Sequence, residues 1–233
     1  MSPKPLARAA ETDAATRDRL LAVGTKLFAE RGFQRVTVRD ICTEAGANVA
    51  AINYHFAGKE GLYMEVLRTA VGIMGGTTEA MKRAGEGKSP EEQLTALVRT
   101  FLERIVAGRD GWIHQLMLQE MREPTPGLDL VIHEVIGPRF GYIREVVARL
   151  LDCDDVNDRR VLACATSVQS QLMVVLKSPV AAKLGLPPLT TDDIPEVAGH
   201  IARFSLAGIR AIAGADGVNA PRRRTGRRSR RDR

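Results

Sequence analysis

Apolar residues recur at helical spacing, three or four positions apart, along most of the chain. The first such run lies on one face of a helix that Gly32 would end, and it holds Leu20, Val23, Leu27 and Phe28. No segment alternates apolar and polar residues in the manner of a strand. The pattern therefore predicts an all-α protein of about nine helices, preceded by a flexible arm over residues 1–11.

Two short helices are predicted directly after the first. Thr37 and Asp40 have the spacing of a capping box that opens one of them, and Gly46 ends it. Asn48 is a good N-cap for the other, which covers residues 49–55. Three helices around a tight Ala-Gly-Ala turn, the third only about seven residues long, are typical of a helix-turn-helix. Such a unit lays one helix in the major groove of DNA.

A longer series of helices is predicted from Lys59 onward. Ser89-Pro-Glu-Glu92 is a strong helix start, and Gly137-Pro138 is expected to bend a helix because an interior proline removes a backbone hydrogen bond. The body ends with two helices over about 156–177 and 192–213. We therefore divide the chain into an arm, a helix-turn-helix domain, a helical ligand-binding and dimerisation domain and a tail, over residues 1–11, 12–58, 59–214 and 215–233.

Positive charge is concentrated in the tail. The chain has a net charge of +6, but the segment from Ala220 holds eight Arg and one Asp, which leaves the rest slightly acidic. A low-complexity segment of this kind is predicted to be disordered. Two readings of it stay open: it adds sequence-independent affinity for DNA, or it is a solvated tail without a role. Charge therefore does not by itself indicate DNA binding by the folded part.

Several function classes lack any signal. The three cysteines and four histidines show no zinc spacing, and no apolar run is long enough for a membrane span or follows the N-terminus as a signal peptide. The sequence holds no GxSxG, HExxH, P-loop or GxGxxG motif. We therefore expect no enzyme, no catalytic or metal site, no cofactor, no membrane association and a reduced, cytoplasmic location.

The motifs over residues 16–64 resemble the TetR family of bacterial transcription regulators. They read Leu27-Phe-Ala-Glu-Arg-Gly-Phe33, Thr37-Val-Arg-Asp-Ile41, Ala45-Gly-Ala-Asn-Val-Ala-Ala-Ile-Asn-Tyr-His-Phe56 and Lys59-Glu-Gly-Leu-Tyr63. The resemblance implies a homodimer that binds a pseudo-palindromic DNA operator through two recognition helices one helical turn apart. It also implies a small-molecule effector that binds the helical body, shifts the helix from Lys59 and changes the spacing of the recognition helices.

The resemblance and the residue chemistry together give nine candidate DNA contacts. The candidates for gripping phosphates are Thr37, Arg39, Tyr54, His55 and Lys59, of which Arg39 can also reach a base edge. The candidates for the base-reading face are Asn48, Val49, Ala50 and Asn53. Asn48 is equally well explained as a helix cap alone. Residues 50–53 depart from the Gly-Thr-Leu-Tyr of many relatives, which leaves their contacts less defined than those of the Tyr-His-Phe segment.

A second resemblance concerns the body. Leu118-Gln-Glu-Met-Arg-Glu-Pro-Thr-Pro-Gly-Leu-Asp129 resembles the CecR-like (CerR-type) group of TetR regulators, and Ser170-Gln-Leu-Met173 with Leu184-Gly is similar to a looser pattern of that group. This resemblance implies a repressor of efflux or drug-response genes. The candidate ligand contacts are polar residues on mainly apolar helices, although such residues more often lie at the surface or in a satisfied core. They are Trp112, His114, Gln115, Gln119, Glu120, His133 and Gln169.

Dimerisation is expected through the last two helices. Their apolar seams can pair with those of a second copy as a four-helix bundle, or can form an ordinary core within one chain. The seams hold Leu162, Ala165, Val168, Leu172 and Leu176, and the series from Ile194 to Ile212. The alternative function for the whole chain is a non-specific nucleic-acid-binding protein that uses the helix-turn-helix and the arginine-rich tail.

Overall fold

The computed structural model describes residues 5–107, 111–174, 183–185 and 189–219, and every regular element within them is a helix. The N-terminal elements are α1 (Pro5–Arg31), α2 (Val38–Ala45), α3 (Val49–Phe56) and α4 (Lys59–Gly85). The C-terminal elements are α5 (Pro90–Ala107), α6 (Gly111–Arg122), α7 (Leu128–Val131), the π-helical turn η1 (Ile132–Ile136), α8 (Gly137–Leu150), α9 (Arg159–Val174) and α11 (Ile194–Asn219). With α7, η1 and α8 counted as one rod, the described residues hold nine helices, which confirms the predicted all-α fold.

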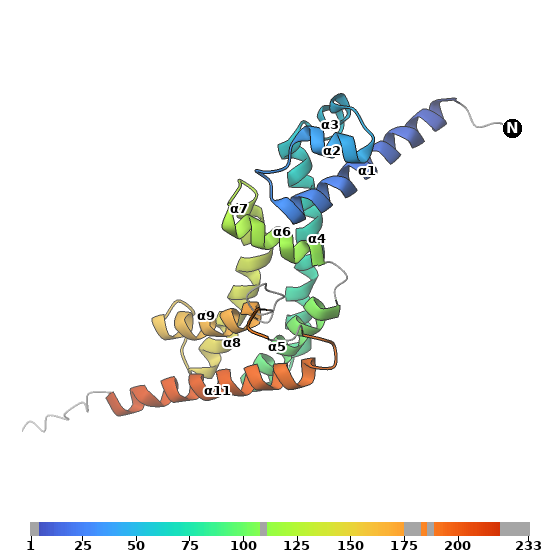
Figure 1. Cartoon of the computed structure of the whole chain (residues 1–233). Helices are drawn as coiled ribbons and strands as arrows, with labels where there is room; N and C mark the ends of the chain where they lie inside the picture. The colour runs from blue at the N-terminus through green and yellow to red at the C-terminus, as the bar shows by residue number, and fades with distance from the viewer. Residues whose placement is uncertain (1–4, 108–110, 175–182, 186–188, 220–233) are drawn as a thin grey trace, which may run out of the picture.

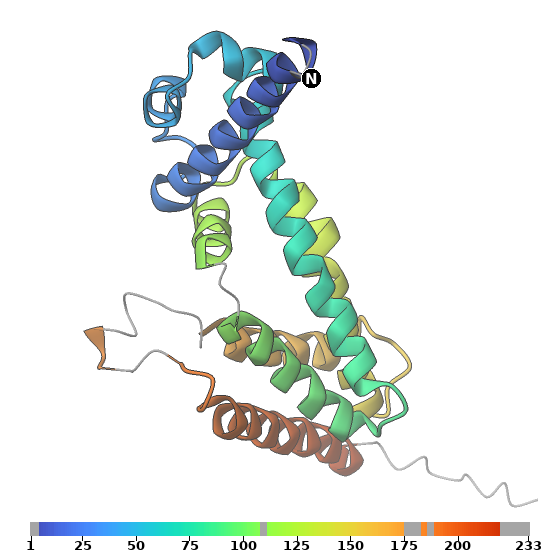
Figure 2. The ribbon, with the colours of Figure 1, turned by 90° about the vertical axis from the view of Figure 1, so that its right-hand side faces the viewer.

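The long helix α4 joins the two halves of the molecule (Figure 1, Figure 2). α1, α2 and α3 gather around its N-terminal end, and α5, α8, α9 and α11 form a bundle at its other end. α6 and α7 lie between these groups, where α6 packs against α1 and α7 packs against α4. None of the described helices has the length and apolar character that crossing a bilayer requires.

Two apolar clusters form the core of these halves. One contains Phe28 and Ile52, and it extends into Leu116 of α6 and Val131 of α7. The other lies inside the bundle of α5, α8, α9 and α11. Although α6 and α7 follow the bundle helix α5 in sequence, they bury their apolar faces with the N-terminal helices. The body is therefore packed directly onto the helix-turn-helix.

Local interactions fix the two short helices. The predicted capping box is present at α2: the Thr37 hydroxyl accepts from the Asp40 N–H at 3.1 Å, and the Asp40 carboxylate accepts from the Thr37 N–H at 2.9 Å. Hydrogen bonds from the Thr37 hydroxyl and N–H hold the pKa of the Asp40 carboxyl below its ordinary value. Gly46 ends α2 with a φ of 61°, a left-handed conformation that glycine adopts without steric cost.

Two predicted helix boundaries differ from the structure, and one predicted bend takes a particular form. α1 begins at Pro5, inside the segment predicted as an arm; alanine-rich sequence favours a helix, and proline fits its first turn. The predicted bend before Pro138 takes the form of η1, in which the Gly137 N–H donates to the Ile132 carbonyl. α11 continues to Asn219, and the arginine-rich tail beyond it lies outside the described residues.

The apolar seams that were expected to pair two copies are largely internal. Side chains of α9 and α11 from both seams are buried in the bundle core of this same chain, among them Ala165, Val168, Leu172, Ile194 and Ile201. Leu176 lies outside the described residues. α5 and α8 cover this stripe, so these residues form a core within one chain, and the predicted pairing of two copies through them was wrong.

Candidate nucleic-acid interface

α3 buries one face and presents the other to solvent. Ile52 and Phe56 belong to the N-terminal core. The opposite face consists of polar and small side chains that are all exposed, namely Asn48, Val49, Ala50, Asn53 and Tyr54. Tyr54 is 77% exposed although it is aromatic, and no core contact explains its presence there. The N-cap and these four α3 residues, all predicted to contact DNA, therefore form one continuous surface, which we call the α3 face.

The start of α2 flanks this helix with two more candidates. Thr37 and Arg39 are both exposed. The Thr37 hydroxyl donates to the Asp40 carboxylate at 2.7 Å, so its hydrogen is already used within the capping box. Arg39 forms no ion pair with any described residue, and its guanidinium is available to a phosphate or a base edge.

His55 lies beneath the α3 face rather than on it. Its side chain is only 6% exposed, and its Nε2 lies 3.4 Å from a carboxylate oxygen of Asp13. The imidazole ring also packs edge-on against the Tyr54 ring, with 4.9 Å between centroids. His55 therefore joins α3 to α1 and supports the exposed tyrosine, a position that sequence reasoning did not anticipate.

Lys59 has a structural role that sequence reasoning missed. Its ammonium donates to the carbonyls of Phe33 and Val36, both at 3.1 Å, and lies 4.1 Å from the centroid of the Phe33 ring. These carbonyls belong to the loop between α1 and α2, so the lysine at the start of α4 holds that loop in place. An ammonium has three N–H donors, and the third remains for a phosphate.

Asn48 caps α3, and substitutions can separate this role from contact with a base. Its side-chain oxygen accepts from the Ala51 N–H at 2.9 Å. We expect Asn48→Ala to lower the free energy of unfolding by about 1 kcal/mol, measured by urea denaturation, because an orphan N–H at the helix start loses its acceptor. Asn48→Ser should keep the stability, since serine caps equally well. If Asn48→Ala unfolds at the wild-type urea concentration, the capping role is contradicted.

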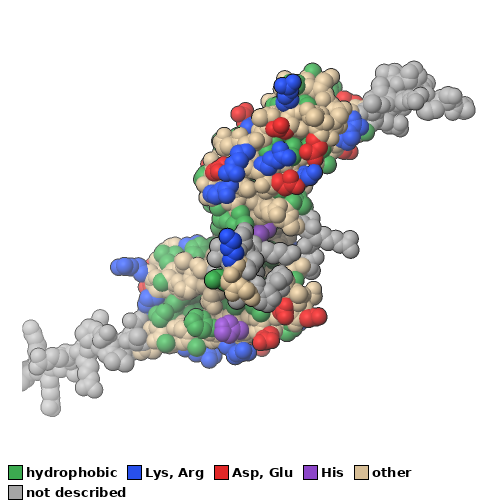
Figure 3. Space-filling model, viewed as in Figure 1, with side chains coloured by type: hydrophobic (Ala, Val, Ile, Leu, Met, Phe, Trp, Pro, Cys, Tyr) green, Lys and Arg blue, Asp and Glu red, His purple; other side chains and the backbone are tan. Residues whose placement is uncertain are grey.

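The surface of the N-terminal half carries charges of both signs. Figure 3 shows Lys and Arg side chains interspersed with Asp and Glu over the upper part of the molecule. Some are paired within it, as in Lys26 with Glu44 at 2.8 Å and Arg17 with Glu65 at 2.7 Å. Positive charge is therefore not continuous on this face, and contact with DNA would depend on the placement of particular side chains.

The seven candidate ligand contacts do not meet in one cavity of the described structure. Trp112 and Gln115 line a shallow hollow between α6 and α1. His114 is half-buried on the same helix, and Gln119 accepts from Arg122 at its end. The remaining candidates are His133, which is exposed on η1, Gln169 on α9 and Glu120. This hollow lies outside the bundle of α5, α8, α9 and α11 and brings together only two of the seven candidates.

Glu120 is the centre of a buried hydrogen-bond network. It is 1% exposed, and one of its carboxylate oxygens accepts from the Tyr63 hydroxyl of α4. The other oxygen accepts from the N–H and the hydroxyl of Thr125, both at 2.8 Å. Burial, and then the neighbouring carboxylate, raise the pKa of Tyr63 far above its ordinary value, so its hydroxyl remains a donor. Glu120 thus ties the end of α6 to α4 and to Thr125 in the segment that follows α6.

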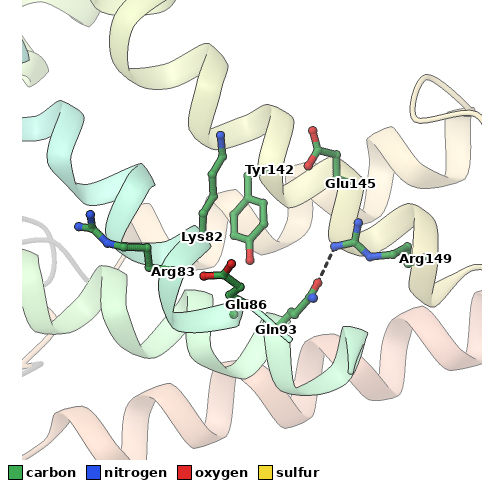
Figure 4. A pocket seen from close by; sticks show the side chains of 8 residues that line it. Lys82, Arg83, Glu86, Gln93, Tyr142, Glu145 and Arg149 are labelled. Atoms are coloured by element: carbon green, nitrogen blue, oxygen red, sulfur yellow. Dashed lines mark hydrogen bonds between the residues drawn. The ribbon is translucent and has the colours of Figure 1, made fainter. Parts of the chain in front are cut away.

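A second hollow lies at the far end of α4 (Figure 4). Its walls carry charged and polar side chains from α4, α5 and α8, namely Lys82, Arg83, Glu86, Gln93, Tyr142, Glu145 and Arg149. Arg149 donates to Gln93 across it, and both signs of charge face the same open space. Ligand sites are usually enclosed and mostly apolar, so this surface is a poor candidate for an effector site.

Comparison with known proteins decides the family. Residues 20–66 match the tetR family of bacterial regulatory proteins. Residues 90–209, more than half of the chain, match the C-terminal domain of the HTH-type transcriptional dual regulator CecR. The chain belongs to the TetR family, in its CecR group. It is therefore a DNA-binding transcription regulator and not an enzyme, as the motifs of both halves predicted.

Individual relatives agree with this TetR assignment. CecR of Shigella flexneri is 26% identical over 61% of this chain and 67% of its own length. The repressor KstR2 of Rhodococcus jostii is 33% identical over 56% of this chain and 57% of its own length. The chain thus aligns with between about half and two thirds of these two relatives. They support membership of the same family and do not identify an effector or target genes.

Solved structures share the fold. The ketosteroid transcriptional regulator KstR2 of Mycobacterium tuberculosis superposes with a TM-score of 0.59 at 21% identity, over 82% of this chain and 93% of that one. The TetR family regulator PfmR from Thermus thermophilus gives a TM-score of 0.56 at 22% identity, over 81% and 97%. At these identities the likeness concerns the fold alone.

Proposed function

We propose that the protein is a ligand-responsive repressor that binds a pseudo-palindromic operator as a homodimer and leaves it when a small molecule binds the body. The observation that carries the proposal is the α3 face, an exposed polar surface on a helix that is capped at its start and packed on its other side. Repression is supported by the KstR2 relatives, which are repressors. Control of efflux or drug-response genes is the expectation for the CecR group.

The faces of α9 and α11 that point away from the core provide the dimer surface. Gln171 of α9 donates to Ser205 of α11 at 3.1 Å, which holds the two helices side by side. Several of their exposed residues are small, which allows close approach of helices from a second copy; these are Ala163, Thr166, Ser167, Ser170, Ala207, Gly208 and Ala211. Phe204 lies among them with its ring stacked on that of His200, and at 66% exposure most of this large apolar side chain is open to contact with a second copy.

Phe204→Arg is expected to convert the dimer to a monomer. An arginine at this position would bring two like charges to an apolar interface, where they cannot be solvated. Sedimentation velocity at micromolar protein should show the monomer mass for this variant and the dimer mass for the wild type. Ile73→Arg, on an exposed position of α4, is the matched control and should remain dimeric. A dimeric Phe204→Arg variant would rule out this surface.

The Glu120 network provides a path from the body to the DNA-reading half. α6 and α7 share the N-terminal core, while α5 and α8, which flank them in sequence, belong to the bundle. A ligand that changes the packing of the bundle would therefore displace α6, and Glu120 would transmit the displacement to Tyr63 on α4. The ligand need only bind one arrangement better than the other to shift the equilibrium.

Quantitative binding to the DNA upstream of the protein's own gene, against random duplex at near-physiological salt, tests the proposal. A site-specific regulator should prefer the upstream duplex by roughly a thousandfold or more. Comparable affinity for both duplexes, over several upstream fragments, would contradict site-specific regulation and favour the general nucleic-acid-binding alternative. Repeating the titration after trimming the chain at Asn219 separates the contribution of the arginine-rich tail.

A further inference from the structure

The bundle contains a buried cation that no described residue neutralises. Arg139, in the first turn of α8, is only 5% exposed. Its Nε is buried without a hydrogen-bond partner, and no carboxylate of the described residues forms an ion pair with it. Glu120, buried to a similar degree, has three donors around it. Buried polar groups in proteins are almost always paired, so this arginine needs an explanation.

Arg139 remains charged in this environment. Burial lowers the pKa of its guanidinium to about 10, which is still well above neutral pH. The side chain therefore carries a desolvated positive charge, an unfavourable arrangement unless something compensates it. The nearest compensation is the ring of Phe101 on α5, whose centroid lies 5.2 Å from Cζ of the guanidinium. A ring face attracts a cation, but it fills none of the guanidinium's hydrogen-bonding positions.

A second unpaired group lies on the helix that packs against α8. Gln169 of α9 has its amide oxygen buried without a partner. α8 and α9 pack against each other, so Gln169 belongs to the same bundle as Arg139. Around them the bundle is apolar, with Phe101, Ile143 and Leu172 in its core. The π turn η1 ends three residues before Arg139, and such turns recur at functional sites.

We infer that Arg139 binds the acidic group of the effector, and that the effector is an amphipathic organic anion. A carboxylate or a phosphate would pair with the guanidinium, whose planar fork of donors matches such oxygens. The Gln169 amide would hydrogen-bond a further polar group, and the apolar part of the ligand would pack beside Phe101. The inference rests on the proposed function, because it names the chemical class of the small molecule that relieves repression.

Thermal unfolding of the full-length protein with three probes of equal chain length tests this inference. The probes are sodium decanoate, decyl phosphate and the uncharged decanol. We expect at least one of the two anions to raise the Tm of the wild type by several degrees, and decanol to leave it unchanged. The larger of the two Tm shifts shows whether the site prefers a carboxylate or a phosphate. Arg139→Met should abolish the shift, while its own Tm without a probe should equal or exceed that of the wild type.

The Tm of Arg139→Met without a probe separates a ligand site from a structural role. If Arg139 stabilised the fold, its replacement would lower this Tm. Arg149→Met, on an exposed position of the same helix, is the matched control and should retain the shift. An equal shift with decanol, a shift that survives Arg139→Met, or no shift with either anion would overturn the inference. Operator binding by the same samples without a probe is measured alongside. If the protein binds the operator but neither anion raises its Tm, the inference alone is refuted. If the protein does not bind the operator, the proposed function is refuted.

Discussion

Glu120→Ala is expected to lower the free energy of unfolding by about 3 kcal/mol, since it leaves several buried donors without an acceptor. The Tyr63 hydroxyl, the Thr125 N–H and the Thr125 hydroxyl all lose their partner at once. Alanine is too small to fill the space, so the contact between α6 and α4 also loosens. Urea denaturation at fixed protein concentration measures the change, which should appear as a lower midpoint.

Two variants calibrate that result. Tyr63→Phe removes one donor and leaves the carboxylate bonded to Thr125, so it should cost only about 1 kcal/mol. Glu123→Ala, one turn further on, breaks a more exposed ion pair with Arg35 and should change the stability by less than about 0.5 kcal/mol. Equal effects of Glu120→Ala and Glu123→Ala would show that the buried network does not stabilise the fold.

Lys59→Met is expected to lower the free energy of unfolding by about 2 kcal/mol, because hydrogen bonds from a charged donor are worth more than neutral ones. The variant keeps most of the apolar stem of the side chain, but it leaves the Phe33 and Val36 carbonyls without their donor. It also removes the contact of the ammonium with the Phe33 ring. The loop between α1 and α2 should loosen, and hydrogen exchange of its amides should become faster.

Lys26→Met provides the comparison within the same half of the protein. Lys26 pairs with Glu44 at an exposed site, where ion pairs contribute little to stability. Loss of this pair should therefore leave the urea midpoint of unfolding almost unchanged. A Lys59→Met variant as stable as Lys26→Met would contradict the structural role of Lys59. In that case any loss of operator affinity in the Lys59 variant would come from a missing phosphate contact alone.

The parts of the fold that depend on neighbouring residues could be predicted from the sequence. The capping box of Thr37 and Asp40 and the cap at Asn48 involve groups three residues apart, so their residue types suffice to identify them. The exposed α3 face follows from the same short helix, because the spacing of Ile52 and Phe56 determines which side is buried.

The parts that depend on distant contacts could not be predicted. Tyr63 and Glu120 are 57 residues apart, and no pattern shows that the two side chains meet. Periodicity identified an apolar stripe on α9 and α11 but could not tell whether α5 and α8 or a second copy covers it. Arg139 was not a candidate, because only the assembled bundle shows that its surroundings lack an acid.

The account makes the α3 face the surface that reads the operator, and titration of base-substituted duplexes tests this most directly. The wild type, Asn53→Ala and Tyr54→Ala are compared on the upstream duplex and on a set with single base-pair changes. Asn53→Ala should lose discrimination at one base pair per half-site, worth about 1–3 kcal/mol, while Tyr54→Ala should weaken binding to every duplex alike. Wild-type affinity and discrimination in both variants would contradict the account.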